Sequence, residues 1–132
     1  MQSLLSNPYK NEFVAAFKGD HSGELKPKQT PGVLYSKANP TPVKKPTLLA
    51  RSEELAQQLG VTKPETQDEI DILGGNRVTP SMQPYAACYA GHQFGNWAGQ
   101  LGDGRAITLA EWEAPDGKTW EVQLKGAGPT PF

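Results

Sequence analysis

Three glycines, an arginine and a lysine are the residues of this chain whose types and spacing best suit chemistry on a phosphate group. The glycines fall within one short stretch and the arginine follows directly: Gly99, Gly102, Gly104 and Arg105. A glycine-rich loop leaves backbone N–H groups uncovered, so that they can donate to phosphate oxygens. A guanidinium beside the loop matches paired phosphate oxygens, and Lys125 adds a compact positive charge. The glycine cluster together with Arg105 and Lys125 is therefore our candidate for a phosphate-binding site.

Two strands joined by a tight turn are expected to position these residues. Segments 105–114 and 119–125 are rich in β-branched and aromatic residues, and the Pro-Asp-Gly-Lys sequence between them is typical of a hairpin turn. In the second segment alternate apolar residues, beginning at Trp120, share one face, which predicts that this face is buried. The glycine cluster leads into the first strand and Lys125 ends the second, so the hairpin should bring them together.

Short helices are predicted elsewhere in the chain. Ser52 is a suitable N-cap for a helix over 53–59, which a glycine would end. Residues 13–17 predict one or two helical turns. Residues 81–90 predict a second short helix, closed by the glycine that follows. The expected fold class is therefore α+β.

The first third of the chain is polar and rich in proline. Proline recurs throughout residues 26–46. Each proline removes a backbone hydrogen-bond donor, which disfavours long helices and strands in this stretch. We expect this stretch to run extended, with 33–36 as a possible edge strand. We divide the chain into an N-terminal extension, 1–46, and a region that carries the hairpin, 47–132.

Composition and charge exclude several classes of function. With 132 residues the chain is long enough for one domain with a core. A net charge of -1 gives no reason to expect nucleic acid, whose phosphates require a basic face. No apolar run approaches the ~20 residues that span a bilayer, and the N-terminus lacks the pattern of a secretion signal. The single Cys88 cannot form an internal disulfide, so we expect a cytoplasmic protein. Because the net charge does not favour nucleic acid, we expect the partner to be a small molecule or another protein.

A glycine loop followed by a strand lysine is the layout of a protein kinase N-lobe. Kinases show G-x-G-x-x-G, whereas the order in this chain is G-x-x-G-x-G. A P-loop is excluded because no G-x-x-x-x-G-K-[ST] occurs, and a Rossmann motif because a hairpin follows the glycines. A glycine cluster can also be only a turn and a strand-end lysine only a solvated charge, so the residues alone leave both interpretations open. His21 and His92 lie far apart and predict no metal site.

Longer stretches of the chain resemble the selenoprotein O family. The sequences YAGHQFGNWAGQLGDGRA and QLKGAGPTPF are long and idiosyncratic, and the similarity extends over about 29–132. Members of this family are enzymes with a pseudokinase fold that transfer AMP from ATP to protein hydroxyl groups. The resemblance implies part of a kinase-like N-lobe, in which Gly102, Gly104 and Arg105 bind ATP and Lys125 is the strand lysine. The chain departs from the family pattern at Ala110, where the family has glycine.

The resemblance also implies what a longer protein would add. Family members are several times longer, so we expect this chain to be an N-terminal part, without a catalytic residue or metal ligand of its own. The base aspartate and the ligands of Mg²⁺ or Mn²⁺ are expected beyond residue 132. The implied reaction is AMP transfer from ATP to Ser, Thr or Tyr of protein substrates, with release of pyrophosphate and little activity in this chain alone. The alternatives are a nucleotide- or partner-binding module without catalysis, UMP transfer, and kinase-type phosphotransfer.

Overall fold

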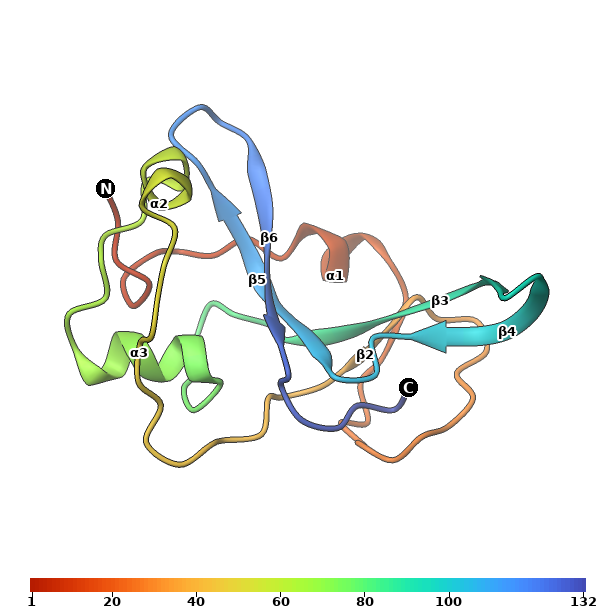
Figure 1. Cartoon of the computed structure of the whole chain (residues 1–132). Helices are drawn as coiled ribbons and strands as arrows, with labels where there is room; N and C mark the ends of the chain where they lie inside the picture. Colours follow the sequence, from red (N-terminus) through yellow and green to blue (C-terminus); the bar gives the residue numbers. More distant parts are fainter.

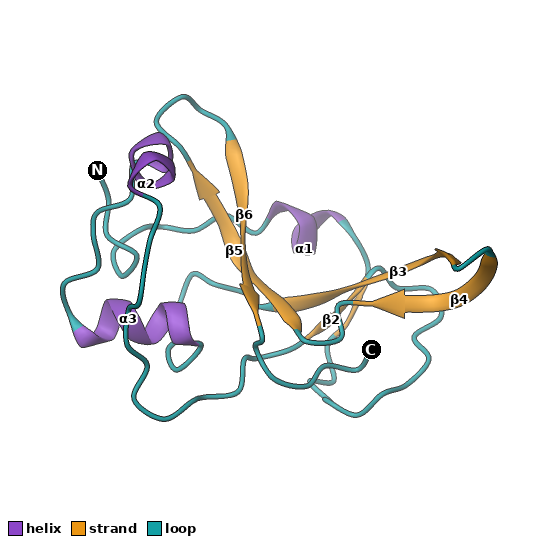
Figure 2. Cartoon of the chain, in the orientation of Figure 1, coloured by secondary structure: helices purple, strands orange, loops and turns teal.

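The computed structural model describes residues 1–132 and has an α+β architecture: one twisted sheet with three short helices beside it (Figure 1). Figure 2 shows how much of the chain is loop. A mixed sheet with few helices is compatible with a kinase-like N-lobe. The helices are α1 (Glu12–Ala16), α2 (Glu53–Leu59) and α3 (Gln67–Gly74), and the strands are β1 (Gly19–Asp20), β2 (Tyr35–Lys37), β3 (Tyr85–Gln93), β4 (Asn96–Gly102), β5 (Ala106–Glu113) and β6 (Thr119–Lys125).

The six strands pair in the order β1-β2-β3-β5-β6, and β4 pairs with the outer part of β3. Only β1 and β2 are parallel; the other pairs are antiparallel. The β3–β4 hairpin projects away from the rest of the molecule (Figure 1). Its tip carries Phe94, which is fully exposed, and Trp97, which is 62% exposed.

The β5–β6 hairpin confirms the strands predicted at 105–114 and 119–125. Every residue of β5 except the last is buried, because the sheet is covered on both faces at this point. On β6 the predicted inward face is only half-buried, at Val122 and Leu124, which pack against the core, while Trp120 is 36% exposed near the turn.

The helix predicted over 81–90 is wrong, because these residues lie mostly in β3. Their alanines suit a helix, but the segment pairs with β2, β4 and β5, and such tertiary pairing outweighs local propensity. Phe94 and Gly95, both with positive φ (50° and 81°), form the tight turn into β4. The strand predicted at 33–36 is present as β2, but it lies between β1 and β3 and is not an edge.

The helix predicted at 53–59 is confirmed as α2, whose Ser52 cap accepts a hydrogen bond from the Leu55 N–H and which ends at Gly60 in the left-handed conformation. The helical turn predicted near 13–17 is confirmed as α1. The sequence analysis did not predict α3, which brings the fully buried Ile72 into the core. None of the three helices is long and apolar enough to cross a bilayer.

The core lies where β5 meets the N-terminal residues. Trp112 of β5 is 1% exposed, donates its indole N–H to the Leu59 carbonyl (2.6 Å) and packs edge-on against Tyr9. The buried Glu111 carboxylate accepts the first two N–H groups of α1. Residues before 46 thus contribute to the same core as the hairpin, and the division of the chain at residue 46 stays a prediction.

Candidate phosphate-binding site

The four sequence-predicted residues lie together at one end of the β5–β6 hairpin. Gly102 ends β4, Gly104 and Arg105 lead into β5, and Lys125 ends β6. The Arg105 carbonyl accepts the two backbone N–H groups that follow Lys125, at 2.9 and 3.0 Å, which fixes the lysine next to the loop. We call residues 102–105 the glycine loop.

The two candidate glycines of this loop are required for different reasons. A Cβ on Gly102 would lie 2.5 and 2.7 Å from ring atoms of Phe132 and 2.8 Å from the Ala87 carbonyl oxygen, so the packing of the chain itself demands glycine there. A Cβ on Gly104 would meet only the Phe132 carbonyl oxygen at 3.6 Å, an ordinary contact, and Gly104 does not have a positive φ. Nothing in the fold therefore requires glycine at 104.

The peptide units of the glycine loop are oriented by hydrogen bonds on one side. The carbonyl oxygens of Asp103 and Gly104 both accept from the Thr130 hydroxyl. In a trans peptide the N–H points opposite to the C=O, and the chain contains no cis peptide bond. The N–H groups of Gly104 and Arg105 therefore point away from Thr130. Neither has a hydrogen-bond acceptor within the chain.

The glycine loop is also tied to β3 through Asp103 and Ala87. The Asp103 N–H donates to the Ala87 carbonyl (2.9 Å), and the Asp103 carboxylate accepts from the Ala87 N–H (3.1 Å). The carboxylate is thus turned toward the sheet.

Two cations without ion-pair partners belong to residues whose backbone adjoins the free N–H groups. The chain forms six ion pairs, and none of them involves Arg105 or Lys125. Both side chains are exposed. Two successive free N–H groups, on a backbone whose neighbouring residues carry an unpaired guanidinium and an unpaired ammonium, suit an anion with several oxygens, such as phosphate.

The residues present do not form a metal site. No group of three or more His, Cys, Asp or Glu side chains is arranged to hold a metal ion. Asp103 is the one acidic residue of the glycine loop, and the Ala87 N–H already engages its carboxylate.

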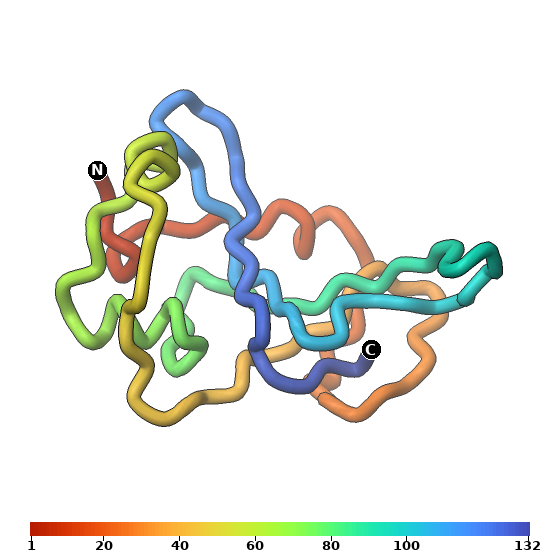
Figure 3. The backbone as a smooth tube through the Cα atoms, viewed as in Figure 1, coloured from red at the N-terminus to blue at the C-terminus, as the bar shows by residue number.

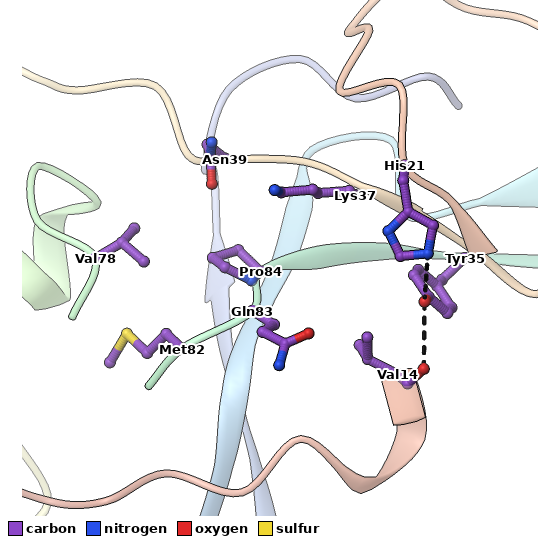
Figure 4. A pocket seen from close by; sticks show the side chains of 9 residues that line it. All are labelled: Val14, His21, Tyr35, Lys37, Asn39, Val78, Met82, Gln83 and Pro84. Atoms are coloured by element: carbon purple, nitrogen blue, oxygen red, sulfur yellow. Dashed lines mark hydrogen bonds between the residues drawn. The ribbon is translucent and has the colours of Figure 1, made fainter. Parts of the chain in front are cut away.

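A separate cavity of about 290 Å³ lies beside β2 and the segment that leads into β3 (Figure 4). His21, Tyr35 and Lys37 lie on its polar side, and the Tyr35 hydroxyl joins the Val14 carbonyl and the His21 ring, each at 3.3 Å. None of the four candidate residues lines this cavity, so it is not part of the glycine-loop site.

Comparison with known proteins identifies the family. A family model described as protein adenylyltransferase SelO matches residues 20–132, which include the whole glycine loop and both cations. The chain belongs to the SelO family. The resemblance found from the sequence is thereby confirmed.

Relatives of this SelO-family chain are named as protein nucleotidyltransferases. A protein nucleotidyltransferase YdiU of Cytophaga hutchinsonii is 54% identical over 132 residues, which cover 100% of this chain and 25% of the relative. Proteins of the same name from Nitrosospira multiformis (48% over 134 residues) and Azoarcus sp. (51% over 126 residues) match 100% and 94% of this chain and 24% of their own length. The chain thus spans about a quarter of the length of these relatives.

Sequence reasoning missed Asp103 and Thr130, the two residues that hold the glycine loop in place. Asp103 stands inside the glycine cluster, where an aspartate is also typical of a plain turn. Thr130 stands between two prolines near the end of the chain, and its role depends on that segment folding back onto the loop. No local pattern signals such a contact.

Proposed function

We propose that this chain is the ATP-binding part of a protein nucleotidyltransferase that transfers AMP from ATP to Ser, Thr or Tyr hydroxyl groups of proteins and releases pyrophosphate. The observation that supports ATP binding most is the pair of unpartnered N–H groups at Gly104 and Arg105, in a loop whose Arg105 and whose neighbour Lys125 form no ion pair. The names of the family and of the relatives support the class of reaction.

In this proposal the chain binds and orients the triphosphate. The two N–H groups and the Arg105 guanidinium donate to phosphate oxygens, and the Lys125 ammonium neutralises a further charge. The acceptor hydroxyl oxygen attacks the α-phosphorus and loses its proton to a base, and the bond to the β-phosphate oxygen breaks as pyrophosphate leaves. Because the base and the metal ligands are proposed to lie outside this chain, the 132-residue chain alone is expected to transfer no AMP.

ATP binding is tested by calorimetric titration of the 132-residue chain with charge-removing variants. Lys125→Met and Arg105→Met should each weaken ATP binding by about tenfold or more, since a hydrogen bond to a charged group contributes about 1.5–3 kcal/mol. Lys118→Met is the matched control, because Lys118 lies in the turn at the other end of the same hairpin. Its Nζ is 3.9 Å from the Asp116 carboxylate. Equal loss in the control and in the other two variants would exclude a site at the glycine loop.

The reaction is tested in a chimaera in which residues 1–132 replace the matching quarter of the Cytophaga hutchinsonii relative. Protein labelling from α-labelled ATP indicates AMP transfer, labelling from γ-labelled ATP indicates phosphotransfer, and preferential labelling from α-labelled UTP indicates UMP transfer. Bound ATP without any label indicates a binding module. We expect α-label from ATP only, and a sharp reduction of that label in Lys125→Ala.

A further inference from the structure

We propose that Thr130 is a positioning residue for phosphate binding: its buried hydroxyl holds two successive peptide units of the glycine loop so that their N–H groups face the phosphate. This inference rests on the proposed ATP binding at that loop.

The Thr130 hydroxyl makes three contacts in a buried position. The side chain is 2% exposed. Its oxygen lies 2.5 Å from the Asp103 carbonyl oxygen and 3.2 Å from that of Gly104, to which it donates, and it accepts the Phe132 N–H at 3.2 Å. The hydroxyl thus joins two neighbouring carbonyl groups that precede it in the chain by more than two dozen residues.

Two successive carbonyl groups that point to the same side are unusual in an extended backbone, where they alternate. Here the shared hydroxyl keeps both of them inward. The N–H groups of the same two peptide units, at Gly104 and Arg105, consequently both point outward, away from Thr130. Without the hydroxyl, neither carbonyl group would have a hydrogen-bond donor within the chain. Rotation of the peptide units toward another donor would turn the N–H groups with them.

The segment that carries Thr130 is itself fixed in place. Residues 126–132, which we call the return segment, run back beneath the sheet toward the glycine loop (Figure 3). The first two N–H groups of the return segment donate to the Arg105 carbonyl. Further along, the Ala127 carbonyl accepts the Thr41 N–H (2.8 Å), and the Pro131 carbonyl accepts the Lys28 N–H (2.9 Å). The prolines on either side of Thr130 restrict the backbone further. The hydroxyl is therefore presented to the loop from a rigid support.

The test compares three threonine substitutions in the 132-residue chain. Thr130→Val keeps the shape of the side chain but removes the hydroxyl, and Thr130→Ser keeps the hydroxyl. Thr79→Val is the matched control, because Thr79 is also buried (5% exposed) but its hydroxyl has no hydrogen-bond partner. ATP affinity is measured by calorimetric titration, and folding by the dispersion of the amide NMR spectrum.

We expect Thr130→Val to weaken ATP binding by about tenfold or more, and Thr130→Ser and Thr79→Val to change it by less than about threefold. Weakened binding restored by serine supports the inference. ATP affinity in a folded Thr130→Val equal to that of the unaltered chain would overturn it. If the proposed ATP binding itself were wrong, the unaltered chain would bind no ATP at all. This result differs from the one that would overturn only the role of Thr130.

A second measurement avoids the risk that Thr130→Val does not fold. Nuclear Overhauser effects between the Gly104 and Arg105 amide protons and the Thr130 side-chain protons of the unaltered chain report on which side these N–H bonds lie. The inference requires both amide protons to show no strong effect to Thr130, and Thr130→Ser to leave this result unchanged. A strong effect from either amide proton to Thr130 would overturn it.

Discussion

Replacing the two glycines of the glycine loop separates the packing role of this loop from its proposed binding role. Gly102→Ala places a methyl group 2.5 Å from the Phe132 ring and 2.8 Å from the Ala87 carbonyl oxygen. Real Cβ atoms essentially never approach other atoms this closely, and the Ala87 oxygen belongs to the backbone of β3 and cannot move independently. Gly104→Ala creates no such contact.

The expected magnitudes follow from these distances. Overpacking of this kind costs about 1–3 kcal/mol, and alanine recovers about 0.4–1 kcal/mol by restricting the unfolded chain. Gly102→Ala should therefore lower the free energy of unfolding by about 1–2 kcal/mol, or Tm by roughly 3–10 °C for a chain of this size. Gly104→Ala should leave stability unchanged or raise it by up to about 1 kcal/mol, yet weaken ATP binding, because a side chain next to the Gly104 N–H hinders the close approach of a phosphate to the backbone.

Urea denaturation and ATP titration of both variants measure the two effects. Phe132→Ala is the companion change: combined with Gly102→Ala it removes the ring contact but not the contact with Ala87. The double variant should accordingly lose less stability than the two single changes predict together. A Gly102→Ala chain as stable as the unaltered one, or a Gly104→Ala chain less stable than Gly102→Ala, would refute this account of the loop.

Three further predictions concern the core and two titrating groups. Trp112→Phe removes the indole N–H that donates to the Leu59 carbonyl at 2.6 Å. Urea denaturation should show the free energy of unfolding lowered by about 2–3 kcal/mol. A loss below about 0.5 kcal/mol would contradict this prediction. Burial raises the pKa of Tyr9 from 10.0 to about 12, so the folded chain holds the phenol proton more tightly than the unfolded chain does. The free energy of unfolding should therefore fall as the pH rises from 10 to 12. Tyr9→Phe should make this fall less steep, and an unchanged slope would refute the prediction. The hydrogen bond from Lys28 lowers the pKa of Asp20 from 3.8 to about 2. In Lys28→Met, NMR titration of the carboxyl group should show the pKa of Asp20 raised toward 3.8. An unchanged pKa would show that Lys28 is not the cause of the low value.

The sequence predicts the β5–β6 hairpin because its signals are local. Apolar alternation from Trp120 and a Pro-Asp-Gly-Lys turn lie within one continuous segment, and the capping residues of α2 adjoin the helix that they cap. The position of Lys125 beside Arg105 follows directly from the register of this hairpin. These elements need no information from distant parts of the chain.

The errors and omissions have the opposite character. The alanine-rich segment of β3 becomes a strand because of partners in β2, β4 and β5, which local propensity does not include. The requirement for Gly102 arises from a ring that lies thirty residues further along the chain, at Phe132. The contact of Thr130 with the glycine loop likewise depends on the return segment folding back. Sequence reasoning named the four proposed binding residues but not Asp103 and Thr130, which hold the glycine loop.

The central claim is that the glycine loop binds the triphosphate of ATP through its two free N–H groups. It is tested most directly by amide NMR titration of the 132-residue chain, without added metal, with ATP, with inorganic tripolyphosphate and with adenosine. The account predicts that the Gly104 and Arg105 amide signals shift most, with ATP and with tripolyphosphate, and remain in place with adenosine. Saturable ATP binding that leaves both signals unmoved, or an equal shift with adenosine alone, would contradict it.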